Sequence, residues 1–295
     1  MGQFKPCFSI LPPAQKRLWP ELRNAAGLGF TLYGGTAIAL RLGHRNSVDF
    51  DFFSEKQLDR EAIKAAFPFV PQSETLQDQG NALTVLVPYG DSGTEHVKVS
   101  FFGTIAFGRV GEPDFTDDGV LQVASFDDLM ATKVKVVLQR AEAKDYRDIA
   151  AMVTAGVSLS RGLASARQLY GVNFQPSESL KALGYFNDGD LKTLTAREKS
   201  ILVNAVKTVL DFPDVPLRSN SLSLSNLGGH DPLDETIRRT VSGQGLLSAL
   251  GDRQPLRPAL TADQQTALRK RMDAVAARLA QGQQQDQRPD DGPSP

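Results

Sequence analysis

The chain has 295 residues, of which 41% are hydrophobic and 23% charged, a composition that excludes a wholly disordered polypeptide and allows one large domain or two modest ones. The chain has 33 basic and 34 acidic residues, so its net charge is −1. This balance excludes a basic surface over the whole chain, and any contact with nucleic acid therefore needs a local basic patch. Cys7 is the only cysteine, which excludes an intramolecular disulfide, and we expect a reduced, cytoplasmic setting without a membrane span.

The first 125 residues mix strand and helix signals. Four runs show the alternation or the β-branched and aromatic content of strands, and two intervening segments have the spacing of short helices. We therefore expect an α+β domain over residues 1–125. The predicted strands are 30–34, 47–53, 81–89 and 95–102, and the predicted helices are the segment that ends at Gly43 and residues 58–67.

From Ser125 onward the sequence becomes helical in character. Thr195 with Glu198, and Thr261 with Gln264, have the spacing of capping boxes in front of apolar runs. A loop-like composition interrupts this part, although some of it also alternates like an edge strand. We expect a helical domain over residues 126–280, with a connector at 213–235, and a disordered tail over 281–295.

Two aspartates stand on one face of the predicted strand 47–53. Alternation places Asp49 and Asp51 on the face opposite Phe50 and Phe52. Neighbouring like charges repel, so this pair calls for a compensating cation, and Mg²⁺ is the hard divalent ion that carboxylates and phosphates commonly share. A solvated strand face with two surface aspartates gives the same pattern and remains an alternative.

The turn before this strand has the features of a phosphate-binding turn. Gly34 and Gly35 end the preceding strand, and Thr36 opens a helix. Glycines let the backbone approach a ligand closely, and amide groups at the start of a helix favour an anion. By itself the tripeptide is also compatible with an ordinary turn.

Taken together, the segment YGGTAIALRLGHRNSVDFDFF, residues 33–53, resembles the first motif of the DNA polymerase β nucleotidyltransferase superfamily. More narrowly, it resembles the AbiEii/AbiGii family of bacterial nucleotidyltransferase toxins. The resemblance covers roughly residues 28–210. It implies a nucleotidyltransferase-like mixed β-sheet flanked by helices, followed by a helical domain, and it implies a toxin that pairs with an antitoxin.

One residue of the superfamily pattern is missing. A third carboxylate usually comes from a later strand, and by register that position is Ser100, with Lys98 and His96 on the same face. A serine hydroxyl does not replace an anionic ligand. The departure leaves three options: catalysis with one metal ion held by Asp49 and Asp51, help from a carboxylate elsewhere, or a protein that binds nucleotide without transferring it.

A second cluster is basic. If one helix ran through residues 133–148, then Lys133, Arg140, Lys144 and Asp148 would share a stripe, although a solvated helix face would look the same. The resemblance implies that the cations of this cluster grip a triphosphate and that an aspartate adds a carboxylate to the site. We favour Asp148 for that role and expect Asp145 to orient a neighbouring base.

The resulting hypothesis is a metal-dependent enzyme that transfers NMP from an NTP to an acceptor hydroxyl, for which RNA such as tRNA is a candidate. Alternatives are a non-catalytic binding module of the same fold and a small-molecule nucleotidyltransferase. His44 and Arg45 could reach a phosphate, pair with Asp51 or cap a helix. The predicted catalytic residues are Asp49, Asp51, Lys133 and Asp148, the first two also holding Mg²⁺, and the predicted nucleotide-binding residues are Gly34, Gly35, Thr36, Arg45, Arg140, Lys144 and Asp145.

Overall fold

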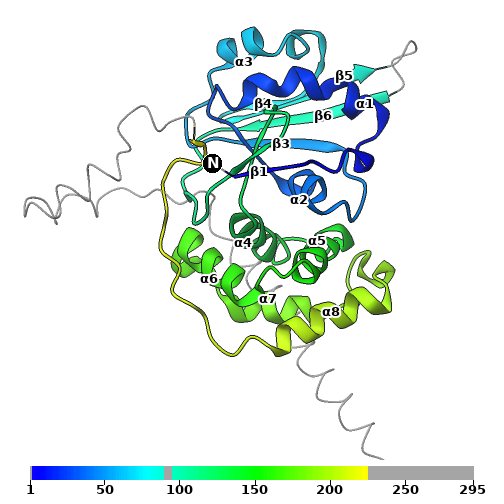
Figure 1. Ribbon diagram of the computed structural model, residues 1–295, viewed down its shortest axis with the longest axis vertical. Helices are drawn as coiled ribbons and strands as arrows, with labels where there is room; N and C mark the ends of the chain where they lie inside the picture. The colour runs from blue at the N-terminus through cyan, green and yellow to red at the C-terminus, as the bar shows by residue number, and fades with distance from the viewer. Residues whose placement is uncertain (1, 90–94, 225–295) are drawn as a thin grey trace, which may run out of the picture. The chain divides into compact units, whose positions relative to one another are not determined.

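A mixed β-sheet organises the first half of the chain (Figure 1). The computed structural model describes residues 2–89 and 95–224, which belong to one compact unit spanning Met1–Arg238. The described strands form one sheet in the order β1-β7-β8-β2-β3-β6-β5-β4, in which β3 is antiparallel to β2 and parallel to β6. The strands are β1 Gln3–Phe4, β2 Thr31–Tyr33, β3 Asp49–Phe53, β4 Glu74–Gln79, β5 Ala82–Tyr89, β6 Glu95–Phe102, β7 Asp114–Thr116 and β8 Gln122–Val123.

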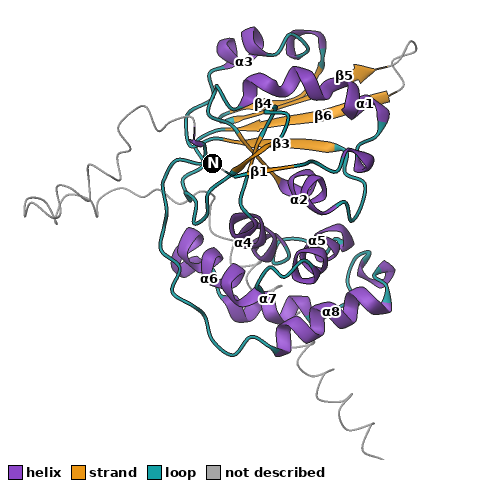
Figure 2. Ribbon diagram, viewed as in Figure 1, coloured by secondary structure: helices purple, strands orange, loops and turns teal. Residues whose placement is uncertain are grey.

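Helices lie on either side of this sheet and then follow it along the chain (Figure 2). The α-helices are α1 Pro13–Leu18, α2 Gly34–Leu42, α3 Arg60–Ala66, α4 Phe126–Val136, α5 Ala143–Thr154, α6 Leu159–Tyr170, α7 Pro176–Leu183 and α8 Ala196–Lys207. Short 3₁₀ segments are η1 Phe8–Ile10, η2 Trp19–Ala25, η3 Val70–Gln72, η4 Gly171–Asn173 and η5 Leu191–Thr193. Within the described residues, no helix is both long enough and apolar enough to cross a bilayer.

The fold is α+β, as the sequence predicts. Among the described residues, the last strand, β8, ends at Val123, and the first helix of the helical region, α4, begins at Phe126. The change from strands to helices therefore falls where the sequence pattern changes. The division of the chain into two domains at residue 125 stays a prediction. The predicted capping box of Thr261 and Gln264 and the tail 281–295 lie outside the described residues.

One face of the central strands is an aromatic core. Phe50 and Phe52 of β3 are fully buried, and the ring of Phe52 stacks on that of Phe101 with 5.5 Å between centroids. Phe67, which follows α3, packs on Phe101 from outside the sheet, and Trp19 after α1 packs on Phe50. Since alternate residues of a strand point to opposite faces, this burial directs Asp49 and Asp51, which alternate with the two phenylalanines, to the other face.

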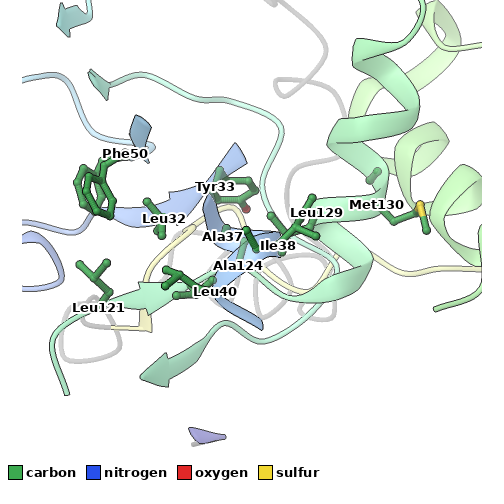
Figure 3. Close-up of a cluster of buried hydrophobic side chains, with 14 of the residues drawn as sticks. Leu32, Tyr33, Ala37, Ile38, Leu40, Phe50, Leu121, Ala124, Leu129 and Met130 are labelled. Carbon is green, nitrogen blue, oxygen red and sulfur yellow. The ribbon is translucent and has the colours of Figure 1, made fainter. Parts of the chain in front are cut away.

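The same hydrophobic core continues from the sheet into the helical region (Figure 3). Leu32 of β2, Ile38 and Leu40 of α2, and Leu129 and Met130 of α4 are all fully buried in it. Helix α2 thus lies between the sheet and helices α4 and α5, and it contacts each of them (Figure 1). A displacement of α2 would disturb both layers.

All four predicted strands and both predicted front helices are present. The sequence signals missed β4, whose residues Glu74–Gln79 are exposed throughout and so have no apolar alternation, and the short strands β1, β7 and β8. The capping box at the start of α8 is confirmed, because Thr195 Oγ1 accepts from the amide of Glu198 and the Glu198 side chain accepts from the amide of Thr195.

Residues 215–224, which we call the strap, return from the helical region to the sheet. The strap makes up most of the described part of the predicted connector 213–235. In that part, the expected edge-strand pairing is limited to one bridge, between Arg109 and Ser219. The two Glu55 carboxylate oxygens accept from Ser221 Oγ at 2.9 Å and from the amide of Leu222 at 3.1 Å. Thr31 of β2 donates to the carbonyl of Leu222 at 3.0 Å. The strap therefore ties the end of the helical region to β2 and to the segment after β3.

We expect Glu55→Ala to lower the free energy of unfolding by about 1–3 kcal/mol, because it leaves two hydrogen bonds of the strap without their charged acceptor. Urea unfolding measures the loss, and hydrogen exchange should show faster exchange of the Leu222 amide. Glu74→Ala, at an exposed position of β4, is the matched control. Equal losses in the two variants would contradict this role for Glu55.

Candidate functional site

The acidic face of β3 forms paired rows with β6. Asp49 lies opposite Lys98, and Asp51 lies opposite Ser100. Lys98 Nζ lies 2.8 Å from Asp49 Oδ2, and Ser100 hydrogen-bonds to Asp51. The structure thus brings the predicted acidic pair together on one face and places a serine and a lysine beside it.

The environment of Asp51 favours a nearby cation. Burial raises the pKa of Asp51, and so does the negative charge of Asp49, whereas Lys98 and the Ser100 hydrogen bond lower it without offsetting the rise. Neighbouring carboxylate oxygens are the ligands that Mg²⁺ takes, with the remaining positions left to water and phosphate oxygens. The donor set fits such an ion through Asp49 and Asp51 only, since the described residues contain no group of three or more His, Cys, Asp or Glu placed to hold a metal.

The glycine turn lies directly against these groups. Helix α2 begins at Gly34, whose φ of +78° lies in the left-handed region. A Cβ at Gly34 would lie 2.9 Å from Asp51 Oδ2, and one at Gly35 would lie 2.2 Å from Arg45 Nη2 and 3.4 Å from Asp148 Oδ2. Gly34 is therefore favoured both by its backbone conformation and by the space beside Asp51, whereas a side chain at position 35 would have to displace the guanidinium of Arg45.

The start of α2 keeps its backbone donors. Within the described part of the chain, no side chain caps the helix start and no acidic residue occupies its first turn, so the first amide N–H groups lack intrahelical partners. The Thr36 side chain is engaged elsewhere: it is buried, donates to the carbonyl of Asp49 and lies 2.7 Å from Ser47 Oγ. Thr36 thus joins α2 to β3, and only its backbone is left for the predicted nucleotide contact.

The expectation that one helix runs through residues 133–148 is wrong. Helix α4 ends at Val136, and α5 begins at Ala143. The amide of Ala143 donates to Asp190 Oδ1 at 2.7 Å, so a residue distant in sequence provides the start of the new helix. The stripe expected on one helix is therefore replaced by side chains that meet across a turn.

Two buried aspartates meet a buried lysine across this turn. Lys133 Nζ lies 2.6 Å from Asp145 Oδ1 and 2.7 Å from Asp148 Oδ2, and both aspartate side chains are fully buried. Arg140 Nε adds an ion pair to Asp145 at 2.8 Å. We call Lys133, Arg140, Asp145, Asp148 and the two residues described next the ion cluster. Lys144 lies outside it, because its half-exposed ammonium pairs with Glu142 at 2.7 Å.

His44 and Arg45 bind Asp148. Arg45 donates from Nε to Oδ1 at 2.6 Å and from Nη2 to Oδ2 at 2.9 Å, and His44 Nε2 lies 2.8 Å from Oδ1. Burial alone would raise the pKa of Asp148, but the hydrogen bond from His44 and the charges of Lys133 and Arg45 hold it well below its usual range. No local pattern reveals this pairing, because more than a hundred residues separate the partners.

The ion cluster faces the acidic pair across the glycine turn. Gly34 lies against Asp51, and Gly35 lies against Arg45 and Asp148. The charges of Lys133 and Arg140 also act on Asp51. The predicted residues Asp49, Asp51, Gly34, Gly35, Arg45, Lys133, Arg140, Asp145 and Asp148 are thus brought together, whereas the side chains of Thr36 and Lys144 are engaged with other residues.

Comparison with known proteins identifies one family. Residues 19–212 match a family model described as "Nucleotidyl transferase AbiEii toxin, Type IV TA system". An uncharacterized protein of Aquifex aeolicus (strain VF5) is 29% identical over 162 residues, which are 54% of this chain and 74% of that relative.

Two solved structures are similar in part. A candidate nucleotidyltransferase from H. pylori has a TM-score of 0.45 at 17% identity, over 66% of this chain and 95% of that one. The nucleotidyltransferase toxin MenT4 of Mycobacterium tuberculosis H37Rv has a TM-score of 0.40 at 12% identity, over 66% of this chain and 92% of that one.

Gly34→Ala should destabilise the chain by roughly 2–4 kcal/mol, since it combines a side chain at positive φ with a close contact to Asp51. Gly80→Ala is the control, because Gly80 also has a positive φ but a Cβ there would meet nothing within 4 Å. Thermal or urea unfolding compares the two. If Gly80→Ala is as harmful as Gly34→Ala, the contact with Asp51 carries no weight.

Asp148→Asn should lower the free energy of unfolding by roughly 3–5 kcal/mol at pH 7, because it leaves buried cations without their partner. Because the pKa of Asp148 is lowered in the folded state, its ionised carboxylate stabilises the protein at pH values above the unfolded-state pKa of about 4. This stabilisation is lost as the pH falls from that value toward the folded-state pKa. The difference between wild type and Asp148→Asn should therefore shrink between pH 6 and pH 3, which urea unfolding at several pH values measures.

The control for this measurement is Asp127→Asn, which removes a partly exposed carboxylate that pairs with Arg161 at 2.7 Å. Asp127→Asn should lower the free energy of unfolding by only about 1 kcal/mol. A wild-type to Asp148→Asn difference that is constant over the whole pH range would contradict the depressed pKa of Asp148.

Proposed function

Because this chain belongs to the AbiEii nucleotidyl transferase toxin family of type IV toxin–antitoxin systems, we propose that it transfers NMP from an NTP to an acceptor hydroxyl with the help of Mg²⁺. One observation carries the proposal: the glycine turn lies between the pair of carboxylates on β3 and the ion cluster, in which Lys133 is buried and Arg45 is partly buried. Such a turn offers phosphate a backbone cradle, with a metal site on one side and fixed positive charge on the other.

Asp49 and Asp51 would hold the ion, which would supply positive charge to the triphosphate oxygens and polarise the reacting phosphoryl group. The amides of Gly34 and Gly35 bind phosphate oxygens at the start of α2. Arg45, Lys133 and Arg140 exceed the two aspartates of the ion cluster by one positive charge, so this cluster offers a net attraction to the leaving pyrophosphate. The residues act by positioning and by electrostatics.

The reaction forms a bond between the acceptor oxygen and the α-phosphorus and breaks the bond from that phosphorus to the oxygen that bridges to the β-phosphate. Pyrophosphate leaves, and the proton of the acceptor hydroxyl passes to solvent. RNA such as tRNA is the proposed acceptor, and the family points to a cognate antitoxin as the partner.

A second candidate function is nucleotide binding without transfer. Ser100 favours it, because the residue opposite Asp51 on β6 is neutral and buried. Calorimetry separates the two: nucleotide binding without turnover, unchanged in Ser100→Asp, would support the binding module.

The transfer proposal is tested with Mg²⁺, each labelled NTP and total RNA. We expect label on RNA from the wild type and a loss of roughly 100-fold or more in Asp49→Asn, because a ligand of the ion is gone. Asp78→Asn is the matched control, since Asp78 is also a strand carboxylate in an ion pair, with Arg60, but lies on β4. Absence of label with every NTP would refute transfer to RNA, and label without RNA would indicate a small-molecule acceptor.

A further inference from the structure

The pair Lys98–Asp49 is the feature that the proposed mechanism leaves without a role. Its atoms lie 2.8 Å apart, and the two side chains are 37% and 35% exposed. An ion pair this open adds little to stability. The charge of Lys98 also lowers the pKa of Asp51. One ammonium group therefore acts on both carboxylates of the proposed metal site.

The strand register places the Lys98 ammonium group next to Ser100 and the two aspartates of β3. Lys98 precedes Ser100 by two residues on β6, so both project to the face that carries Asp49 and Asp51. The Ser100 side chain supplies no negative charge where it hydrogen-bonds to Asp51. The face therefore holds two negative charges and one positive charge.

Two divalent ions held about 4 Å apart need carboxylates that bridge them and further anionic ligands for each ion. Here one oxygen of Asp49 faces Lys98, and the third position on the face is neutral. The anionic oxygens suffice for one divalent ion.

We propose that Lys98 takes the place of a second divalent ion, so that this face binds a single divalent cation and presents the Lys98 ammonium as its other positive charge toward the substrate phosphates. This inference rests on the proposed function for its substrate. It makes Lys98 a residue that sets the metal content of the site.

The test measures the binding of Mn²⁺ to the full chain. Binding is monitored through the decrease of the EPR signal of free Mn²⁺. The wild type should bind one Mn²⁺ at this face. Lys98→Met keeps the length of the side chain and removes its charge, and it should bind Mn²⁺ about tenfold more tightly because a repelling charge is gone. Lys98→Arg should behave like the wild type. The double variant Lys98→Met with Ser100→Asp should bind a second Mn²⁺.

Lys64→Met is the matched control, because Lys64 also pairs with a carboxylate, Glu61, at 3.0 Å but lies on α3. It should leave the Mn²⁺ affinity unchanged. Circular dichroism confirms that each variant is folded. Two Mn²⁺ ions on the wild type, none at all, or equal affinity in wild type and Lys98→Met would each overturn the inference.

These outcomes are separate from those of the transfer assay. A chain that transfers no NMP but binds one Mn²⁺, more tightly in Lys98→Met, loses the proposed function and keeps this assignment of Lys98. A chain that labels RNA but binds Mn²⁺ equally with and without Lys98 keeps the function and loses the assignment.

Discussion

A lysine ammonium held between two fully buried aspartates is the interaction on which the site depends. A buried charge is strongly unfavourable unless it is paired, and Lys133 meets that requirement only where α4 and α5 bring Asp145 and Asp148 to it. Asp148 in turn binds His44 and Arg45, which follow α2. The same network therefore fixes the two helices to each other and fixes α2 to both.

The position of α2 then determines the geometry around the acidic pair. Its first residue, Gly34, lies against Asp51, and its Thr36 hydroxyl donates to the backbone of Asp49. Behind the turn, Gly35 leaves room for Arg45. Gly34 and Gly35 have no side chain, and this allows α2 to approach Asp51 and Arg45 closely. A shift of the helix would therefore change the contacts on both of its sides. The acidic pair and the ion cluster thus behave as one site although they lie on different elements.

Local patterns were enough to predict strands β2, β3, β5 and β6, the faces of β3 and the glycine turn, since alternation and glycine placement act within a few residues. They failed where tertiary contacts decide the outcome. The break between α4 and α5 has no Gly or Pro to announce it, because Asp190 and the pairing of Lys133 impose it. Similarly, β4 forms by pairing with β5 although its side chains are exposed, and the Arg45–Asp148 pair joins residues that no sequence window contains.

The geometry also narrows the options that Ser100 leaves open. Help from a carboxylate elsewhere would require an aspartate with a free oxygen, but both oxygens of Asp148 contact Arg45, and Lys133 and His44 contact them as well. Asp145 is held in the same way by Lys133 and Arg140. A metal ion would have to displace these cations to reach either residue. The ion cluster is therefore better suited to orienting positive charge than to binding a metal, and the two carboxylates of β3 remain the place where a divalent ion would be held.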